Sequence, residues 1–328
     1  MERGDDFYSL FVPQKSIMPE LPEVTTTVNG LKKVLPGLSF LSVWTDLAKK
    51  NQAVKHFKET IKDEEFFKNF KSIVVNKKIL SVERRAKNIL INISGGYTIL
   101  IHLKMTGHLL YGEYKKQTVK GQTSWMPKKT ASPLGDPYNR FIHFVFSLSN
   151  GKQLAFCDAR KFGKITIFNT KEISQTTHLK NIGPEPLDKS FSFKLFTERI
   201  KIKTTSKIKT NLMDQSVIAG IGNIYSDEIL WTSGIHPEST SIKIPKDKLQ
   251  NIFNSIKKIL KKGVDFGGDS TSDYRNIDGL RGRFHHHHNV YRLANSSCKK
   301  KGCNGDIIRK VVNGRSAHFC NKHQKLFK

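Results

Sequence analysis

Short apolar runs rich in β-branched residues recur through the first half of the chain, and polar or charged positions lie between them. Turn-forming sequences such as Ser-Gly-Gly at 94–96 and Ser-Asn-Gly at 149–151 separate these runs. Several short strands divided by turns predict a β-sandwich or barrel. The expected strands are 38–43, 72–75, 79–83, 89–93, 97–103, 141–148, 153–157 and 165–169.

The pattern changes to a helical one after the Pro-rich stretch 183–187, which is interpreted as a linker. An earlier helix is expected at 25–35, where Pro36 and Gly37 end it. Residues 46–71 are expected to be helical or irregular, and the basic stretch 113–138 to be a surface loop. The later helices are expected at 189–202, 208–215, 224–233 and 246–263. The fold class is therefore α+β with more than one domain.

Charge points to the class of partner. Lys and Arg number 56 against 28 Asp and Glu, a formal net charge of +28. An excess of this size indicates a polyanionic partner, with nucleic acid ahead of a membrane surface. No apolar run approaches the ~18 residues of a membrane span, and residues 1–17 lack the pattern of a signal peptide. We therefore expect a cytoplasmic protein associated with the nucleoid, with no membrane partner.

Three of the four cysteines lie near the C-terminus, together with a histidine. Cys298 and Cys303 form one pair, Cys320 and His323 form another, and the sequence between the pairs can make a hairpin. Three thiolates and an imidazole suit tetrahedral Zn²⁺, so one structural Zn²⁺ is predicted here. The fourth cysteine, Cys157, lies in an expected strand and is interpreted as a buried small residue.

The stretch Met-Pro-Glu-Leu-Pro-Glu-Val at 18–24 carries unusual chemistry. If Met18 were removed, Pro19 would offer a secondary amine, which can attack an electrophilic sugar carbon and form an iminium. An α-amino group has a pKa of about 8, so a useful fraction is unprotonated at neutral pH. Glu20 and Glu23 are candidate acid–base groups beside it. The plain alternative is a Pro-rich turn with two solvated carboxylates.

Two helical segments flank the glycine-containing turn 219–223. Asn223 begins the second helix, where free N–H groups and the helix dipole favour a phosphate. Lys209, on the earlier helix, could reach the same phosphate. The glycines allow close approach of a ligand, but they serve equally well to pack an ordinary helical hairpin.

These stretches together resemble the formamidopyrimidine-DNA glycosylase/endonuclease VIII family, from Met18 to about Lys325. Their order and spacing are specific to that family. The resemblance rests on MPELPEV at 18–24, RRAKNILI at 84–91, IHLKMTGHL at 101–109, DARKFGK at 158–164, NIGPEPL at 181–187, LMDQSVIAGIGNIYSDEIL at 212–230, GGDSTSDYRN at 267–276 and the Cys-containing module.

The resemblance implies an N-terminal catalytic β-sandwich at 18–187, a helix–two-turn–helix DNA-binding domain at 188–289 and a zinc finger at 290–328, after an extension at 1–17. It also implies a bifunctional glycosylase and abasic-site lyase of base-excision repair, a monomer acting on damaged double-stranded DNA. The implied roles are nucleophile for Pro19, general acid–base for Glu20, assistance to β-elimination for Lys87, assistance to δ-elimination for Arg315, and a phosphate clamp for Lys209 and Asn223.

Three further residues suggest the branch of the family. Met105, Arg160 and Phe162 match the residues that fill the gap left by a flipped base. Met, Arg and Phe at these positions resemble the formamidopyrimidine branch, whose implied substrates are oxidised purines such as 8-oxoguanine and formamidopyrimidines. The alternative within the family is an endonuclease VIII-like enzyme for oxidised pyrimidines. The loop after 267–268 is long enough to cap a flipped purine.

The chain departs from the family pattern in three respects. Residues 1–17 precede Met18, and while they remain attached the Pro19 nitrogen is part of a tertiary amide and cannot attack the sugar. There are three alternatives: translation starts at Met18, the extension is removed, or the protein is a non-catalytic DNA-binding homologue. The last metal ligand is His323 where the family usually has Cys. Phe141 and Thr205 replace residues that contact DNA, and His143 is a candidate to compensate.

Overall fold

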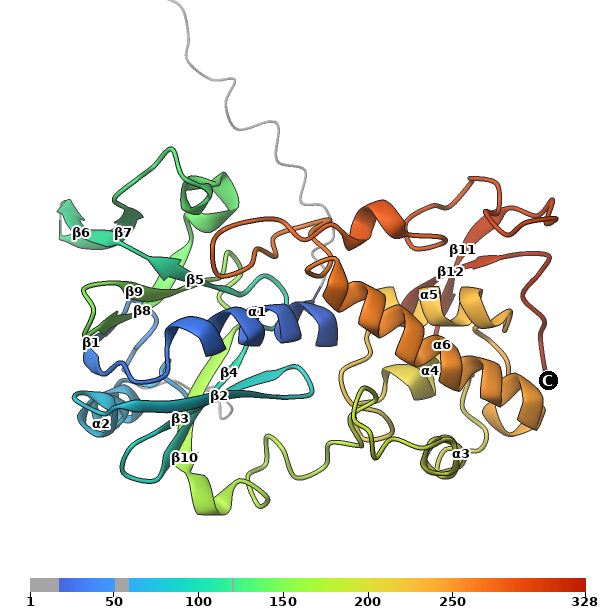
Figure 1. Cartoon of the computed structure of the whole chain (residues 1–328), viewed down its shortest axis with the longest axis horizontal. Helices are drawn as coiled ribbons and strands as arrows, with labels where there is room; N and C mark the ends of the chain where they lie inside the picture. The colour runs from blue at the N-terminus through green and yellow to red at the C-terminus, as the bar shows by residue number, and fades with distance from the viewer. Residues whose placement is uncertain (1–17, 51–58, 120) are drawn as a thin grey trace, which may run out of the picture.

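The first half of the chain forms a β-sandwich, as the sequence predicts. The computed structural model describes residues 18–50, 59–119 and 121–328; the extension 1–17 lies outside them. Two four-stranded sheets with the orders β1-β8-β9-β5 and β10-β4-β3-β2 form its layers (Figure 1). The strands are β1 (Phe40–Thr45), β2 (Ile79–Arg85), β3 (Asn88–Ile93), β4 (Tyr97–His102), β5 (His108–Gly112), β8 (Ile142–Leu148), β9 (Gln153–Cys157) and β10 (Lys164–Asn169).

Helix α1 (Leu21–Val34) belongs to both halves of the molecule. Val24, Val28 and Leu31 bury their side chains in the core that the two sheets share. Leu21, at the start of the same helix, is buried in the separate core of the helical domain. The helix thus crosses from one hydrophobic core to the other, and its first turn is fixed at the junction.

The second half is helical and follows the predicted pattern closely. Its helices are α3 (Phe193–Lys201), α4 (Ile208–Met213), α5 (Asn223–Ser233) and α6 (Lys246–Asp265), with 3-10 turns at Ser241–Lys243 and Phe284–His287. Helix α6 packs against both α5 and α1. Figure 1 shows α5 lying between α6 and the C-terminal hairpin of β11 (Ile307–Val312) and β12 (Arg315–Cys320).

Two sequence predictions in the first half are wrong. Residues 72–75 were expected as a strand, but most of them complete helix α2 (Glu64–Val74), whose first turn the Asp63 side chain caps by accepting from the Phe66 N–H. The stretch 113–138, expected as a loop, instead contains the hairpin β6 (Tyr114–Val119) and β7 (Gln122–Pro127) and two 3-10 turns, Pro133–Gly135 and Pro137–Asn139. Apolar side chains on a short helix look like a buried strand when the run is read alone.

A segment after α6 joins the helical domain to the sandwich. The Tyr111 N–H donates to the Ile277 carbonyl, and Ile277 is buried in the core of the sandwich. The Arg275 guanidinium, almost fully buried, pairs with Asp136 and lies 4.6 Å from the Tyr138 ring centroid. Since these partners lie on opposite halves of the chain, the segment fixes the two halves relative to each other. No helix among the described residues is both long and apolar enough to cross a bilayer.

Candidate active site and nucleic-acid interface

The Glu20 carboxylate joins two helix N-termini. Glu20 is the N-cap residue of α1, and its carboxylate accepts the N–H groups of Gly222 at 2.6 Å and Ile224 at 2.8 Å, which begin α5. A Cβ on Gly222 would lie 2.5 Å from the Glu20 carboxyl carbon, so only glycine fits there. The glycines of the 219–223 turn therefore allow the start of α1 to pack closely against the start of α5. This agrees with the alternative in which these glycines serve packing.

Glu23 lies behind Glu20 and is equally buried. Its carboxylate accepts the Glu20 N–H at 2.7 Å, the Tyr225 hydroxyl at 2.7 Å and the Asp269 N–H at 2.7 Å. Burial, and then the charge of Glu20, raise the pKa of Glu23 to about 7. Burial also raises the pKa of Glu20, although Lys87 and the α5 N–H groups oppose that shift. Two carboxyl groups are thus held side by side with their protons more tightly bound than usual.

Lys87 lies in the two-residue turn between β2 and β3, where Ala86 adopts a left-handed conformation with φ 53°. The Glu185 carboxylate holds this turn by accepting from Arg84, Arg85 and the Ala86 N–H. Lys87 is 7% exposed, not a solvated lysine at a strand edge. Burial lowers the pKa of Lys87, while the charge of Glu20 acts in the opposite direction.

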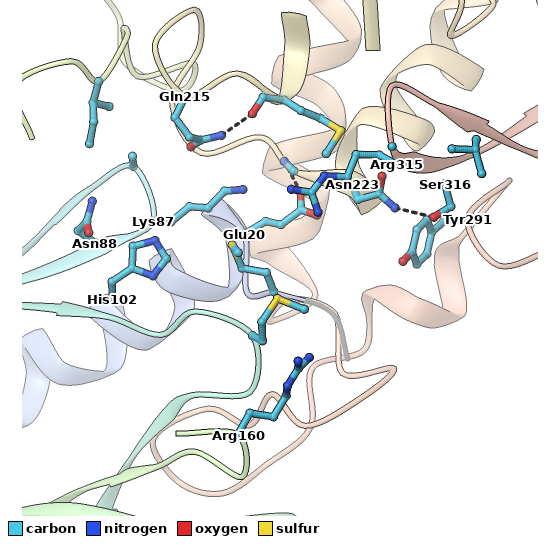
Figure 2. Close-up of a pocket in the computed structure, with 18 of the residues that line it drawn as sticks. Glu20, Lys87, Asn88, His102, Arg160, Gln215, Asn223, Tyr291, Arg315 and Ser316 are labelled. Carbon is cyan, nitrogen blue, oxygen red and sulfur yellow. Dashed lines mark hydrogen bonds between the residues drawn. The ribbon is translucent and has the colours of Figure 1, made fainter. Parts of the chain in front are cut away.

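On the other side of the same pocket lie Asn223 and Arg315 (Figure 2). The Asn223 amide donates to the Ser316 hydroxyl at 3.3 Å. Asn313 and Gly314 both have positive φ, 45° and 75°, as a two-residue type I′ turn requires. This turn brings Arg315, the first residue of β12, to the tip of the hairpin, where its side chain is exposed at the pocket.

Met105 and Arg160 line the pocket from two turns of the sandwich. Asp158 ties these turns together by accepting from the Thr106 hydroxyl and, at 3.3 Å, from the Arg160 N–H. Phe162, in the second turn, is 49% exposed, which excludes a core role, and the Arg160 guanidinium lies 4.5 Å from its ring centroid. An apolar side chain this exposed beside a guanidinium suits contact with stacked bases.

The four predicted metal ligands gather at the base of the β11–β12 hairpin. Their ligand atoms all lie within 4.8 Å of one another, and Cys303 Sγ lies 3.6 Å from Cys320 Sγ. Cys298 Sγ lies 3.3 Å from His323 Nδ1, while His323 Nε2 lies 3.0 Å from the Trp231 carbonyl oxygen. Because a carbonyl only accepts, Nε2 carries the proton and Nδ1 is left to bind metal. These residues fit a tetrahedral metal ion.

Two residues differ from the sequence interpretation. Lys209 is 1% exposed, and its ammonium group donates to Asp227 at 2.6 Å and Ser226 at 2.9 Å, so it is engaged inside the domain rather than turned toward a phosphate. His143, considered as a replacement for the residue missing at Phe141, has its Nδ1 2.9 Å from the Asp46 carboxylate and is 9% exposed.

Sequence reasoning assigned no role to His102, although the motif at 101–109 contains it. His102 lines the pocket beside Lys87 (Figure 2). Its Nδ1 accepts the Lys104 N–H at 3.0 Å, which leaves the proton on Nε2. Burial, and then the positive charge of Lys104, lower the pKa of His102 to about 3. His102 is therefore a neutral hydrogen-bond donor at neutral pH. Tyr291, also unassigned, lines the opposite wall.

The sandwich, the helical module and the metal-binding hairpin together define the class of helix–two-turn–helix DNA glycosylases. The family model described as the formamidopyrimidine-DNA glycosylase N-terminal domain matches residues 18–165, and the one described as the formamidopyrimidine-DNA glycosylase H2TH domain matches residues 182–275. The chain is 35% identical over 311 residues to formamidopyrimidine-DNA glycosylase of Pelotomaculum thermopropionicum, covering 94% of this chain and 100% of that protein. The chain belongs to the formamidopyrimidine-DNA glycosylase family.

Solved structures agree with this assignment. A mutant of Lactococcus lactis Fpg in complex with DNA containing Fapy-dG is 29% identical, with a TM-score of 0.76, and the match covers 94% of this chain and 100% of that one. The complex between L. lactis Fpg and DNA containing an abasic site is 28% identical, also with a TM-score of 0.76, over 93% of this chain and 99% of that one. The fold predicted from the sequence is thus confirmed.

Proposed function

We propose that this protein is a bifunctional DNA glycosylase and abasic-site lyase that removes oxidised purines from duplex DNA. The observation that carries the proposal is that Glu20 and Lys87, both buried, line one pocket. Glu20 directly follows Pro19 in the chain. The pocket has a volume of 840 Å³, within the range of roughly 300–1,000 Å³ typical of ligand sites. The family and the DNA complexes of L. lactis Fpg support the same reaction.

The chemistry begins at the Pro19 nitrogen. As a free secondary amine it attacks C1′ of the damaged nucleotide, a C–N bond to the protein forms, and the bond from C1′ to the base breaks. The departing base takes a proton, and Glu20, whose pKa burial raises, is placed to deliver one. The Pro19 nitrogen then loses its proton, the bond between C1′ and the ring oxygen O4′ breaks, and O4′ takes a proton. The product is an iminium between Pro19 and the opened sugar.

Strand cleavage follows from the iminium. Loss of a proton from C2′ allows β-elimination, which breaks the bond between C3′ and its phosphate oxygen. Loss of a proton from C4′ then allows δ-elimination, which breaks the bond between C5′ and its phosphate oxygen. Each departing phosphate carries negative charge, and Lys87 and Arg315 offer positive charge on two sides of the pocket. We assign Lys87 to the first elimination and Arg315 to the second.

Met105, Arg160 and Phe162 are assigned to the space that a flipped base vacates. An arginine beside two apolar side chains can pair with the orphaned base while the apolar groups keep the neighbouring bases apart. This supports an oxidised guanine opposite cytosine as the substrate. Oxidised pyrimidines are the second candidate, because one similar solved structure is a complex between L. lactis Fpg and DNA containing an oxidised pyrimidine.

Zn²⁺ is the metal that we assign to the C-terminal cluster. Cys298, Cys303, Cys320 and His323 would hold it, and its contribution would be to fold the hairpin that carries Arg315. The site lies in a small module of its own, with no ligand among the residues that line the pocket. Its role in the proposal is therefore structural.

Borohydride trapping tests the proposal. Two forms of the protein, one beginning at Met1 and one at Met18, are incubated with a duplex that carries 8-oxoguanine opposite cytosine. We expect a covalent complex only from the form that begins at Met18, after removal of Met18, because the reaction requires the free Pro19 amine. A parallel duplex with thymine glycol separates purine from pyrimidine preference. Binding of DNA by both forms without any trapped complex would identify a non-catalytic homologue and refute the proposal.

A further inference from the structure

Four basic side chains from four separate segments gather beside the pocket, and we call them the basic cluster: Lys62, Lys104, Lys164 and His178. Lys164 begins β10 directly opposite His102, the last residue of β4. His178 lines the pocket, and its Nδ1 lies 3.1 Å from Lys164 Nζ. Lys104 follows His102 by two residues, and Lys62 adjoins Ile61, whose N–H donates to the Ile165 carbonyl on β10.

Among the residues that the structure describes, two acidic groups act on lysines of the basic cluster: Asp158 on Lys62, and Glu59 on Lys164. Asp158 is fully buried and already accepts from the Thr106 hydroxyl and the Gly163 N–H, whereas Glu59 is exposed. Burial, and then the repulsion among the lysines, lower the pKa of Lys62 and of Lys164. The cluster is therefore a place where an added anion would be stabilised.

Backbone strain marks the two turns beside the cluster. Lys104 and Lys161 adopt left-handed conformations, with φ 56° and 57°, which are uncommon for residues other than glycine. Lys62 Nζ donates to the Lys161 carbonyl at 2.8 Å and so supports one of these turns. Such strain persists where the surrounding structure enforces it, and it gathers at ligand sites. The same two turns carry Met105 and Arg160.

The cluster lies on the same side of the pocket as Lys87, across from Arg315. Figure 2 shows Asn223 and Arg315 on one side of Glu20, and Lys87, Asn88 and His102 on the other. His178, with Lys164 behind it, continues the second side. A DNA strand that presents one sugar to Glu20 carries a phosphate away from that sugar in each direction, so both sides require positive charge.

We propose that the basic cluster is a phosphate-binding subsite for the damaged strand, which it holds on the sandwich side of the pocket. The ligand is a phosphate oxyanion, and we expect the phosphodiester of the uncut strand rather than the terminal phosphate that elimination leaves. The inference rests on the proposed function for the identity of the strand. It adds Lys62, Lys104, Lys164 and His178 to the DNA contacts that the resemblance implied.

The test uses the double substitution Lys104→Gln with Lys164→Gln. The matched control is Lys115→Gln with Lys116→Gln, which removes the same charge from two exposed lysines of the β6–β7 hairpin. Affinity is measured over a range of salt for an uncut duplex with a stable abasic analogue, and for a gapped duplex with or without terminal phosphates at the gap. Thermal unfolding of each variant verifies that it is folded.

For the cluster variant on the uncut duplex, we expect weaker binding and a salt slope shallower by about 0.9, as for the loss of one phosphate contact. The control should keep the parent slope. A loss confined to the gapped duplex with terminal phosphates would assign the cluster to the cleaved end instead. Equal slopes for the parent and the cluster variant on every duplex would overturn the inference. Because none of these measurements needs base excision, absence of a trapped complex would refute the proposed function alone.

Discussion

Two buried ionic clusters lie at helix α5, and they differ in how completely their charges are paired. At its N-terminus, Glu20, Glu23 and Lys87 are all buried next to the pocket, and in the described part of the chain Lys87 has no carboxylate within 4.0 Å. One turn later, Asp227 binds Lys209 at 2.6 Å through one oxygen and His318 Nδ1 at 3.0 Å through the other. The first cluster is incompletely paired, and the second is closed.

The difference shows how burial of charge can serve two purposes. A closed cluster such as the one at Asp227 satisfies its own charges and fastens β12 and α4 to α5. An incompletely paired cluster lowers stability and shifts the pKa values of its members. Such shifts are useful only where a reaction needs a group with a pKa away from its ordinary value. The comparison predicts that substitutions in the two clusters have opposite consequences for activity and stability.

The largest effect on activity is expected for Glu20→Gln. Loss of a general acid–base group typically lowers a rate by roughly 10²–10⁴-fold. The amide oxygen of Gln can still accept an N–H from the start of α5, so folding and DNA binding should be retained. Single-turnover excision of 8-oxoguanine measures the rate, and affinity for the abasic-analogue duplex serves as the control. Equal excision rates for parent and variant would remove Glu20 from the mechanism.

The reverse outcome is expected for Asp227→Asn. The change leaves Lys209 buried without its countercharge, and breaking a buried pair in this way costs roughly 3–5 kcal/mol of unfolding free energy. Urea unfolding at neutral pH measures the loss. At a temperature where the variant is folded, its excision rate should stay within a few-fold of the parent rate. A variant that is stable but inactive would mean that the closed cluster also serves the reaction.

The pH dependence of stability tests the incompletely paired cluster through Glu23. In the folded protein its pKa is about 7 against an ordinary value of 4.5, so the folded state holds a proton that the unfolded chain releases above pH 4.5. Stability therefore falls as pH rises through this window, by about 3 kcal/mol for this group. Glu23→Gln should lack that fall, so the variant gains stability relative to the parent between pH 4.5 and pH 7.

Urea unfolding of both proteins across this range measures the difference. A constant difference between parent and Glu23→Gln would show that Glu23 has an ordinary pKa and is not part of an incompletely paired cluster. A difference that grows in the opposite direction would show that Glu23 is ionised and stabilising in the folded state.

The sequence predicts a feature of these clusters well when the residues that form it lie close together in the chain, and poorly when they lie far apart. Most of the expected strands, the helices after residue 188 and the cluster of metal ligands follow from patterns within a few residues, and the structure agrees with them. Lys209 lies in a recognisable motif, but its partner Asp227 is 18 positions away, and nothing local shows that the two side chains meet inside the domain. Local sequence thus predicted the residue but not its burial.

The same limit applies to the contacts between the two halves. Glu20 meets Gly222 across 202 positions, and Arg275 meets Asp136 across 139. Asp136 lies in the stretch that was predicted to be a loop. Only folding brings such pairs together, so the sequence could name candidate groups at 18–24 and 219–223 without showing that one carboxylate caps both helices. His102 was missed for a related reason, because its proton position depends on the Lys104 backbone.

The smallest effect is expected for Arg315→Gln, at the exposed end of the pocket. Arg315 is exposed at the hairpin tip, so its removal should change unfolding free energy by no more than about 0.5 kcal/mol. Its loss should make the salt dependence of DNA binding shallower by about 1, with Lys301→Gln, an exposed lysine of the same module outside the pocket, as the matched control. Because Arg315 is assigned to the δ-elimination, the variant should also accumulate the product of β-elimination. An unchanged slope with normal δ-elimination would leave the sandwich side of the pocket as the main phosphate contact.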